Sequence, residues 1–284
     1  MVGVDGSLVA RSAVLWAARE ARLRQCALII THIDPPQTDA VGLDRGTSTH
    51  SALLDDSAAA AQREPSISVR TRLLQGSISD ELIRASEMAV LLVIGIDRDK
   101  ERAAYGVLGS VEDRVAVHAH CPVVVVSRPP NSGPEPAREV VVAWIDAMSA
   151  WWAFNAAVAA AEVRRSPLTV LRVMPTNRHD DEPWVDDRPL LEAISSEQPP
   201  CPPNLYIRIS HEVTDDPADA LVRAADGADL LVIGCHHSDD RWSVRTGPVA
   251  EAVMRGATCP VMLVSQPVHW EGDSLHASPA AAQH

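Results

Sequence analysis

The chain carries an internal repeat, and this repeat limits its fold more than any other feature of the sequence. The segment Leu91–Gly95 reads LLVIG, and the same five letters return at Leu230–Gly234, 139 residues later. Likewise, Cys121-Pro122-Val123 returns as Cys259-Pro260-Val261 after 138 residues. Matches that stay in register over such a distance predict two copies of one domain of about 135 to 140 residues.

The composition between and after the copies sets the domain boundaries. Val4-Asp5 corresponds to Ile145-Asp146 at an offset of 141, which fixes the start of the second copy. Prolines and a glycine fill residues 129–137 and predict a linker between domains at 1–128 and 138–268. Residues 269–284 lose hydrophobic periodicity, so we expect a disordered tail. Only four residues precede Asp5, so we also expect a first strand shortened at the chain start.

Each copy reads as strands alternating with helices. In the first copy, the predicted strands are Val2–Asp5, Ala27–Ile33, Ile67–Leu74, Val90–Gly95 and Val123–Val126, and the predicted helices are Ser7–Arg24, Ser51–Gln62, Ser77–Met88 and Gly109–His118. In the second copy, the predicted strands are Val140–Ile145, Leu168–Val173, Tyr206–Val213, Leu230–Gly234 and Val261–Val264, and the predicted helices are Ala150–Val163, Pro217–Ala225 and Pro248–Arg255. The segment Pro175–Asn204, where the second helix of this copy is expected, contains many prolines, so only Leu190–Ser195 could form a turn or two of helix.

Continuous Val, Ile and Leu runs are typical of strands that are buried on both faces. We therefore predict an α/β fold in which each copy is a five-stranded parallel sheet sandwiched by helices. The last strand of each copy, Val123–Val126 or Val261–Val264, would be an exposed apolar edge unless another strand covers it. The helix at Ala150–Ala161 is apolar almost all round, which predicts burial against the other half or against a partner.

Composition excludes several classes of function. A net charge of −13 opposes binding to a polyanion, so we expect no nucleic-acid partner. No run approaches the roughly 18 to 20 apolar residues of a membrane helix. Five scattered cysteines form no C-x-x-C pair, which disfavours a disulfide framework or structural zinc. We expect a cytoplasmic protein with mostly reduced, buried thiols.

The carboxyl ends of parallel strands are the place where ligands bind in such sheets. In the first copy the rim, which is the edge of the sheet formed by these strand ends, holds Asp5, Ile33 and Gly95. After a loop, Gly109-Ser110-Val111 opens a helix, whose free N–H groups and dipole suit an anionic group such as phosphate. Asp5 could accept hydrogen bonds from a ribose or an adenine.

These residues resemble the universal stress protein family in its tandem two-domain form. Val2–Ser7 looks like the opening strand and turn of that family, and Leu91–Gly95 looks like its fourth strand. Gly109–Val123 looks like its closing helix and last strand, so the resemblance covers nearly all of residues 1–268. It implies two tandem Rossmann-like domains of the adenine nucleotide alpha hydrolase-like type. Family domains pair through the last strand, which implies an internal pseudo-dimer and leaves a homodimer through the same strands open.

Many family members bind ATP through the pattern G-x2-G-x9-G-[S/T] after strand four, together with the strand-one Asp and a backbone group after strand two. Carried over, the first-copy site comprises Asp5, Ile33, Gly95, Gly109 and Ser110, with Val111 beside it. The corresponding positions of the second copy are Asp146, Val173, Gly234 and Gly247. The resemblance thus implies ATP as the ligand and an unnamed regulatory protein as a partner.

Both copies depart from that pattern. In the first, Arg98 stands at the second glycine, and ten residues rather than nine separate it from Gly109. A side chain there lies where the family backbone approaches phosphate, although Arg98 could itself supply positive charge. In the second copy, His237 replaces the glycine and Pro248 replaces the Ser/Thr, which removes a hydroxyl and an N–H donor. The first copy is therefore the better candidate.

Three functions follow from these residues. The first is a stress-response regulatory protein that binds an adenine nucleotide without efficient turnover. The second is a nucleotide-free interaction scaffold with degenerate loops. The third, an ATP-dependent enzyme, lacks a base beside a nucleophile, and no nucleophile elbow occurs, so we expect no catalysis. The adjacent His236 and His237 lack further ligands at a recognised spacing, so we expect no metal site.

Overall fold

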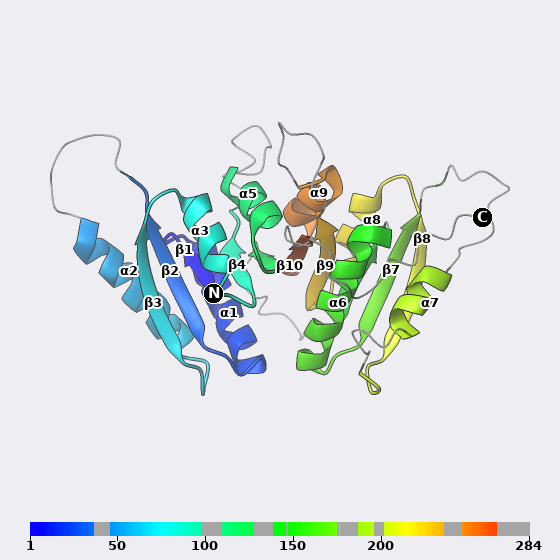
Figure 1. Ribbon diagram of the computed structural model, residues 1–284, viewed down its shortest axis with the longest axis horizontal. Coiled ribbons are helices and arrows are strands. Elements are labelled where there is room, and N and C mark those ends of the chain that lie inside the picture. The colour runs from blue at the N-terminus through cyan, green and yellow to red at the C-terminus, as the bar shows by residue number, and fades with distance from the viewer. Residues whose placement is uncertain are drawn as a thin grey trace, which may run out of the picture.

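The computed structural model places the two repeats in one continuous sheet (Figure 1). The structure describes residues 1–36, 46–97, 110–127, 139–145, 147–174, 176, 187–195, 202–235 and 246–265. Ten strands follow the order β3-β2-β1-β4-β5-β10-β9-β6-β7-β8. The whole predicted linker and the whole predicted tail lie outside the described residues. Figure 1 shows the first half in blue to cyan-green and the second half in green to orange.

Each half contains five strands with helices between them. The elements of the first half are β1 (Val2–Val4), α1 (Leu8–Leu23), β2 (Leu28–Asp34), α2 (Gly46–Ala61), β3 (Val69–Gln75), α3 (Ile78–Ser86), β4 (Leu92–Gly95), α5 (Ser110–His118) and β5 (Val123–Val126). Those of the second half are β6 (Val140–Trp144), α6 (Ala147–Arg164), β7 (Leu168–Met174), α7 (Arg188–Ser195), β8 (Ile207–Val213), α8 (Pro217–Ala224), β9 (Leu230–Cys235), α9 (Pro248–Gly256) and β10 (Val261–Ser265). The predicted order of elements is confirmed.

The sheet is parallel within each half and antiparallel where the halves meet. Strand β5 pairs with β4 in parallel and with β10 in antiparallel register, which places Val124 opposite Met262. This pairing confirms the internal pseudo-dimer. Because β5 and β10 each have a strand on both sides, neither has a free edge, and a homodimer through these strands stays a prediction. The edges of the sheet are β3 and β8 instead.

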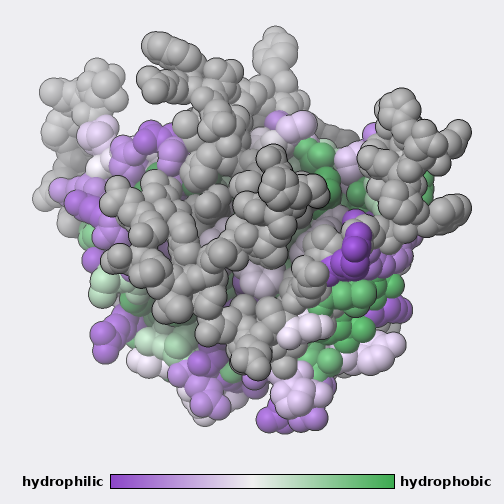
Figure 2. Space-filling model, turned by 45° about the vertical axis from the view of Figure 1, so that its right-hand side comes forward, coloured by the Kyte–Doolittle hydropathy of each residue, from purple (hydrophilic) through white to green (hydrophobic). Residues whose placement is uncertain are grey.

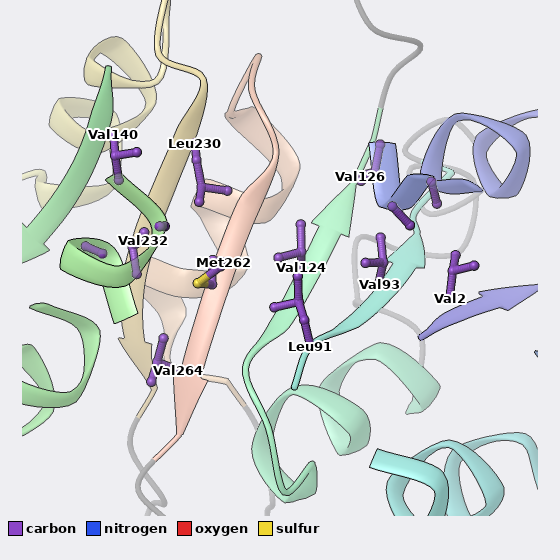
Figure 3. Close-up of a cluster of buried hydrophobic side chains, with 14 of the residues drawn as sticks. Val2, Leu91, Val93, Val124, Val126, Val140, Leu230, Val232, Met262 and Val264 are labelled. Atoms are coloured by element: carbon purple, nitrogen blue, oxygen red, sulfur yellow. The ribbon is translucent and has the colours of Figure 1, made fainter. Parts of the chain in front are cut away.

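Alternation along the central strands explains the two cores. Val124 and Val126 point to the face that α1 and α6 cover, whereas Val123 and Val125 point to the face of α5 and α9. Each core contains residues from both halves, and Figure 3 shows Val124 of β5 beside Met262 of β10 within one of them. The valine runs therefore fill both faces of the seam between the repeats.

Several predicted boundaries were wrong by a few residues. Helix α2 begins at Gly46 rather than Ser51, and α6 begins at Ala147 rather than Ala150. Strand β4 begins at Leu92 rather than at Val90, because Val90 is exposed and precedes the sheet. Helix α7 forms over eight residues, because Pro189 lies in its first turn, where a proline is tolerated, and the proline pairs at 199–200 and 202–203 follow its end.

Strand register corrects the alignment of the two repeats at their first strand. Val4 lies opposite His32 of β2, and Trp144 lies opposite Arg172 of β7. His32 and Arg172 are each the fifth residue of a seven-residue strand, so they are counterparts. Trp144 is therefore the counterpart of Val4, at an offset of 140 rather than 141. Asp5 is therefore matched by Ile145, and Asp146 comes one position later.

The predicted burial of α6 against the other half is confirmed. Arg164 at its end lies over the ring of Trp16 on α1, 5.8 Å from the ring centroid. Its guanidinium Nη2 is 2.5 Å from Oε2 of Glu20, also on α1, and both side chains are more than nine-tenths buried. A buried ion pair thus joins the two helices across the seam.

Candidate functional site

The candidate site of the first half lies at the switch point of the strand order. Strand β1 has β2 on one side and β4 on the other, so the chain leaves the sheet in opposite directions on either side of it. Asp5 follows the end of β1 and is exposed, Ile33 lies near the end of β2, and Gly95 ends β4. The sheet thus brings together three of the predicted residues at one edge.

A tight turn holds the Asp5 carboxylate. The backbone N–H of Ser7 donates to Asp5 Oδ1 at 2.9 Å. Gly6 between them has φ +83°, which a side chain would strain, and an added Cβ would lie 3.0 Å from Leu53 on α2. Ser7 then caps α1, since its Oγ accepts from the N–H of Ala10 at 3.1 Å. One carboxylate oxygen therefore serves the turn, and the group keeps a fixed position at the rim.

Glycine is required at position 95 for a structural reason that is independent of any ligand. A Cβ at this position would lie 2.8 Å from the carbonyl carbon of Val9 and 2.9 Å from the backbone nitrogen of Ala10. The absence of a side chain therefore lets the first turn of α1 pack directly on the end of β4. This contact also brings the Asp5 turn close to the segment that leaves β4.

The start of α5 is acidic. Glu112 and Asp113 lie in its first turn, where carboxylates interact favourably with the helix dipole. Burial, with a smaller contribution from Asp113 and Asp5, raises the pKa of Glu112. Asp113 is buried and accepts a hydrogen bond from Thr246 Oγ1 of the second half at 2.6 Å. These groups compete with an anionic ligand for the helix start.

The second half presents a different rim. Val173 is buried in β7, Gly234 lies within β9, and Gly247 is the exposed N-cap of α9 with Pro248 next to it. An added Cβ on Gly247 would meet no atom within 4 Å. Ile145, the counterpart of Asp5, brings an apolar side chain to this position. This rim therefore lacks a carboxylate at the register position that Asp5 occupies in the first half.

Some predicted residues lie outside the described part of the structure. These are Arg98, Gly109, Asp146, His236 and His237. The backbone of Ser110 begins α5, and Val111 follows it half-buried. The structure therefore places Asp5, Ile33, Gly95 and Val111 around the first rim, and the phosphate loop itself stays a prediction.

A pair of histidines beside this rim was missed by the sequence analysis. His32 and Asp34 lie on β2, on either side of Ile33, and His50 lies on α2. His32 Nε2 is 2.7 Å from His50 Nδ1. Eighteen positions separate the two rings, and no short motif links them, so only the folded chain shows the contact. A histidine within a predicted strand, His32, was the one available signal.

A cavity of about 260 Å³ lies at the opposite end of the strands. Met1, Ala21, Leu28 and Leu91 are among the residues that line it, so it borders the amino ends of β1, β2 and β4. It is therefore separate from the rim that carries Asp5.

The fold defines a tandem α/β protein with a switch point at the strand tips of each half, and comparison with known proteins identifies the family. Residues 1–127 and 138–265 each match the Universal stress protein family. The chain therefore belongs to this family, as its opening and fourth-strand motifs predicted. Within the described residues, no helix is long and apolar enough to cross a membrane.

Relatives match along nearly the whole chain. Universal stress protein Rv2623 of Mycobacterium tuberculosis H37Rv is 27% identical over 288 residues, which cover 94% of this chain and 96% of the relative. Universal stress protein Rv1996 of the same strain is 26% identical over 303 residues, covering 94% and 95% of the two chains. The crystal structure of a universal stress protein from Archaeoglobus fulgidus DSM 4304 superposes with a TM-score of 0.71 at 18% identity, covering 94% and 96%. This structural likeness supports the fold.

Proposed function

We propose that the protein binds an adenine nucleotide, ATP first of all, at the rim of its first half, and that occupancy regulates its contacts with a protein partner. The observation that carries the proposal is the position of Asp5. Its carboxylate is exposed at the switch point of the sheet and held by the Ser7 N–H, beside Ile33 and Gly95. A fixed acceptor at this place can take hydrogen bonds from ribose hydroxyls. Membership of the universal stress protein family supports the same assignment.

The first half is the better candidate for two reasons. Asp5 directly follows its first strand, whereas strand register puts Ile145 at the matching position of the second half. Its closing helix begins with Ser110, whereas α9 begins with Pro248, which has no N–H to offer an anion. We therefore propose one nucleotide per chain, bound without efficient turnover.

A nucleotide-free scaffold is the second candidate, and the acidic start of α5 favours it. Glu112 and Asp113 already satisfy the helix dipole, and their charges oppose a phosphate group. The surface also carries exposed apolar side chains, among them Leu8, Met88 and Tyr206, and Figure 2 shows hydrophobic patches between hydrophilic ones. Under this alternative, the degenerate loops serve protein contacts.

Isothermal titration calorimetry with ATP separates the two candidates. We expect the wild type to bind at micromolar to millimolar ATP, and Asp5→Ala to weaken binding about tenfold or more, because a charge-assisted hydrogen bond is lost. Ile145→Ala at the matching position of the second half is the control, and it should leave binding unchanged. Absence of heat and of retained nucleotide at millimolar ATP in the wild type would leave the scaffold as the function.

We propose the cytoplasm as the location of this function. Cys26, Cys121, Cys235 and Cys259 are all free thiols in the structure. Free thiols in this number are typical of proteins from reducing compartments.

A further inference from the structure

The histidine pair beside the first rim forms a chain of contacts that ends on the backbone of the site. His32 Nδ1 lies 2.8 Å from the carbonyl oxygen of Val4, the last residue of β1. Its Nε2 lies 2.7 Å from His50 Nδ1. The other nitrogen of His50, Nε2, lies 3.8 Å from Oδ1 of Asp34. The chain therefore runs from Val4 through two rings to a carboxylate.

Counting hydrogens along this chain shows where a further proton would bind. The Val4 carbonyl only accepts, so His32 Nδ1 carries a hydrogen. One hydrogen must lie between the two rings, because two lone pairs at 2.7 Å would repel. Two neutral imidazoles hold two hydrogens, which is enough for both of these hydrogen bonds. His50 Nε2 lies 3.8 Å from Asp34 Oδ1, beyond hydrogen-bond distance, so one further proton taken from solvent would bind at this nitrogen, opposite a carboxylate.

The position of this proton links it to the candidate site. His32 and Asp34 flank Ile33, whose backbone is a predicted contact of the nucleoside, and Val4 directly precedes Asp5. Helix α2, which supplies His50, also supplies Leu53 against Gly6 of the Asp5 turn. The pair thus joins α2 to the ends of both strands that hold the rim.

We propose that the His32–His50 pair, with Asp34, is a one-proton switch that positions the first rim and makes nucleotide binding stronger at mildly acidic pH than at alkaline pH. This inference rests on the proposed function, because it regulates the same site. When the proton leaves, His50 Nε2 presents a lone pair to Asp34, and the Asp34 charge beside Ile33 is no longer neutralised. An anionic ligand then meets a less favourable field.

The charges around the pair come from few elements. On β3, the residues in register with His32 and Asp34 are Leu73 and Gln75, which are uncharged. On α1, Arg19 and Arg22 pair with Glu64 beyond the far end of α2. Asp55 and Asp56 on α2 itself are exposed, and Asp5 lies at the end of β1. Among these described neighbours, Asp34 is the group in ion-pair contact with His50.

Nuclear magnetic resonance of the imidazole rings tests the switch without any ligand. Imidazole groups take up their charge between about pH 5 and 8. We expect the ring signals of His32 and His50 to move together in one step as pH falls, and Asp34→Asn to move that step to lower pH. Independent titration of the two rings, or no effect of Asp34→Asn, would overturn the shared proton.

Nucleotide binding tests the consequence. We expect the ratio of ATP affinities at pH 6 and pH 8 to be about two- to fivefold larger in the wild type than in His50→Gln, as one charge near the ligand predicts. Protons that ATP itself takes up affect both proteins and cancel in this comparison. His211→Gln is the matched control, because His211 also faces a carboxylate, that of Asp187, but in the second half. It should keep the wild-type ratio.

The two experiments separate the failures. Coupled ring titration with no ATP binding would sink the proposed function and leave the proton pair standing. ATP binding with equal pH ratios in the wild type and His50→Gln would sink the switch and leave the proposed function standing.

Discussion

At the scale of single residues, the atoms around a glycine show whether the fold itself requires it. Gly95 and Gly247 both belong to the predicted nucleotide pattern, yet their surroundings differ. A Cβ on Gly95 would enter the backbone of α1, and a Cβ on Gly247 would enter open space. Glycine at the end of β4 is therefore required by the fold itself, whether or not a nucleotide binds.

Gly95→Ala should lower the free energy of unfolding by about 1 to 3 kcal/mol, because backbone atoms of Val9 and Ala10 must move to admit the methyl group. Urea denaturation followed by circular dichroism measures the change. Gly247→Ala is the control and should stay within about 0.5 kcal/mol of the wild type. Equal stability of the two variants would show that α1 does not pack on β4 as described.

Glu112 gives a prediction that depends on pH. Burial raises the pKa of this carboxyl in the folded protein, so the folded state holds the proton more tightly than the unfolded state does. The folded state consequently loses stability as pH rises from below the ordinary pKa of 4.5 through the raised value. Glu112→Gln cannot ionise and should avoid that loss.

Thermal unfolding at several pH values measures this effect. We expect Glu112→Gln to be more stable than the wild type at pH 7 and to lose its advantage at pH 4, where Glu112 is protonated. The same variant should bind ATP more strongly, since one negative charge leaves the start of α5. A variant that is less stable than the wild type at pH 7 would mean that the Glu112 carboxylate is stabilising.

At the scale of elements, the helices that meet across the seam carry the specific contacts between the repeats. Arg164 at the end of α6 pairs with Glu20 of α1, and Glu20 also accepts from Arg24 at 2.7 Å. The guanidinium of Arg164 further donates to the carbonyl of Ala160 and lies over Trp16. Buried charges with this number of partners are costly to disrupt.

Arg164→Met should cost about 3 kcal/mol of unfolding free energy, because it leaves the buried Glu20 carboxylate with one fewer partner. Arg114→Met is the control, since Arg114 and Asp80 form a pair that is about half exposed. That substitution should cost less than about 1 kcal/mol. Chemical denaturation of both variants checks the difference, and equal small losses would mean that α1 and α6 are not joined as the structure shows.

The sequence predicts the elements well for a physical reason. Valine and leucine runs of strand length occur at each buried strand, and Ser7, where the first helix was predicted to begin, caps α1 through its bond to the Ala10 N–H. Helix starts were less accurate, because α2 begins in a segment of small polar residues with no distinct cap. Helix α7 was harder to predict, since its buried residue Leu190 packs in a core whose other members are far away in the sequence.

At the scale of the whole molecule, the repeat predicted the two halves and the family resemblance implied their pairing, but the site depends on register. A one-residue difference moves Asp146 away from the position of Asp5, and the repeated letters do not show it. The contact of His32 with His50 and that of Asp113 with Thr246 join residues far apart in the chain, so no local pattern could reveal them. The predicted phosphate loops lie outside the described residues and stay predictions.

The most direct measurement of the central claim is hydrogen–deuterium exchange with and without ATP. If the first rim holds the nucleotide, ATP should slow exchange in the turn after β1 and the residues following β2 and β4, and at the start of α5. The counterparts after β6, β7 and β9, and the start of α9, should exchange at the same rate in both conditions. Protection confined to the second half, or none in either half at millimolar ATP, would contradict the account.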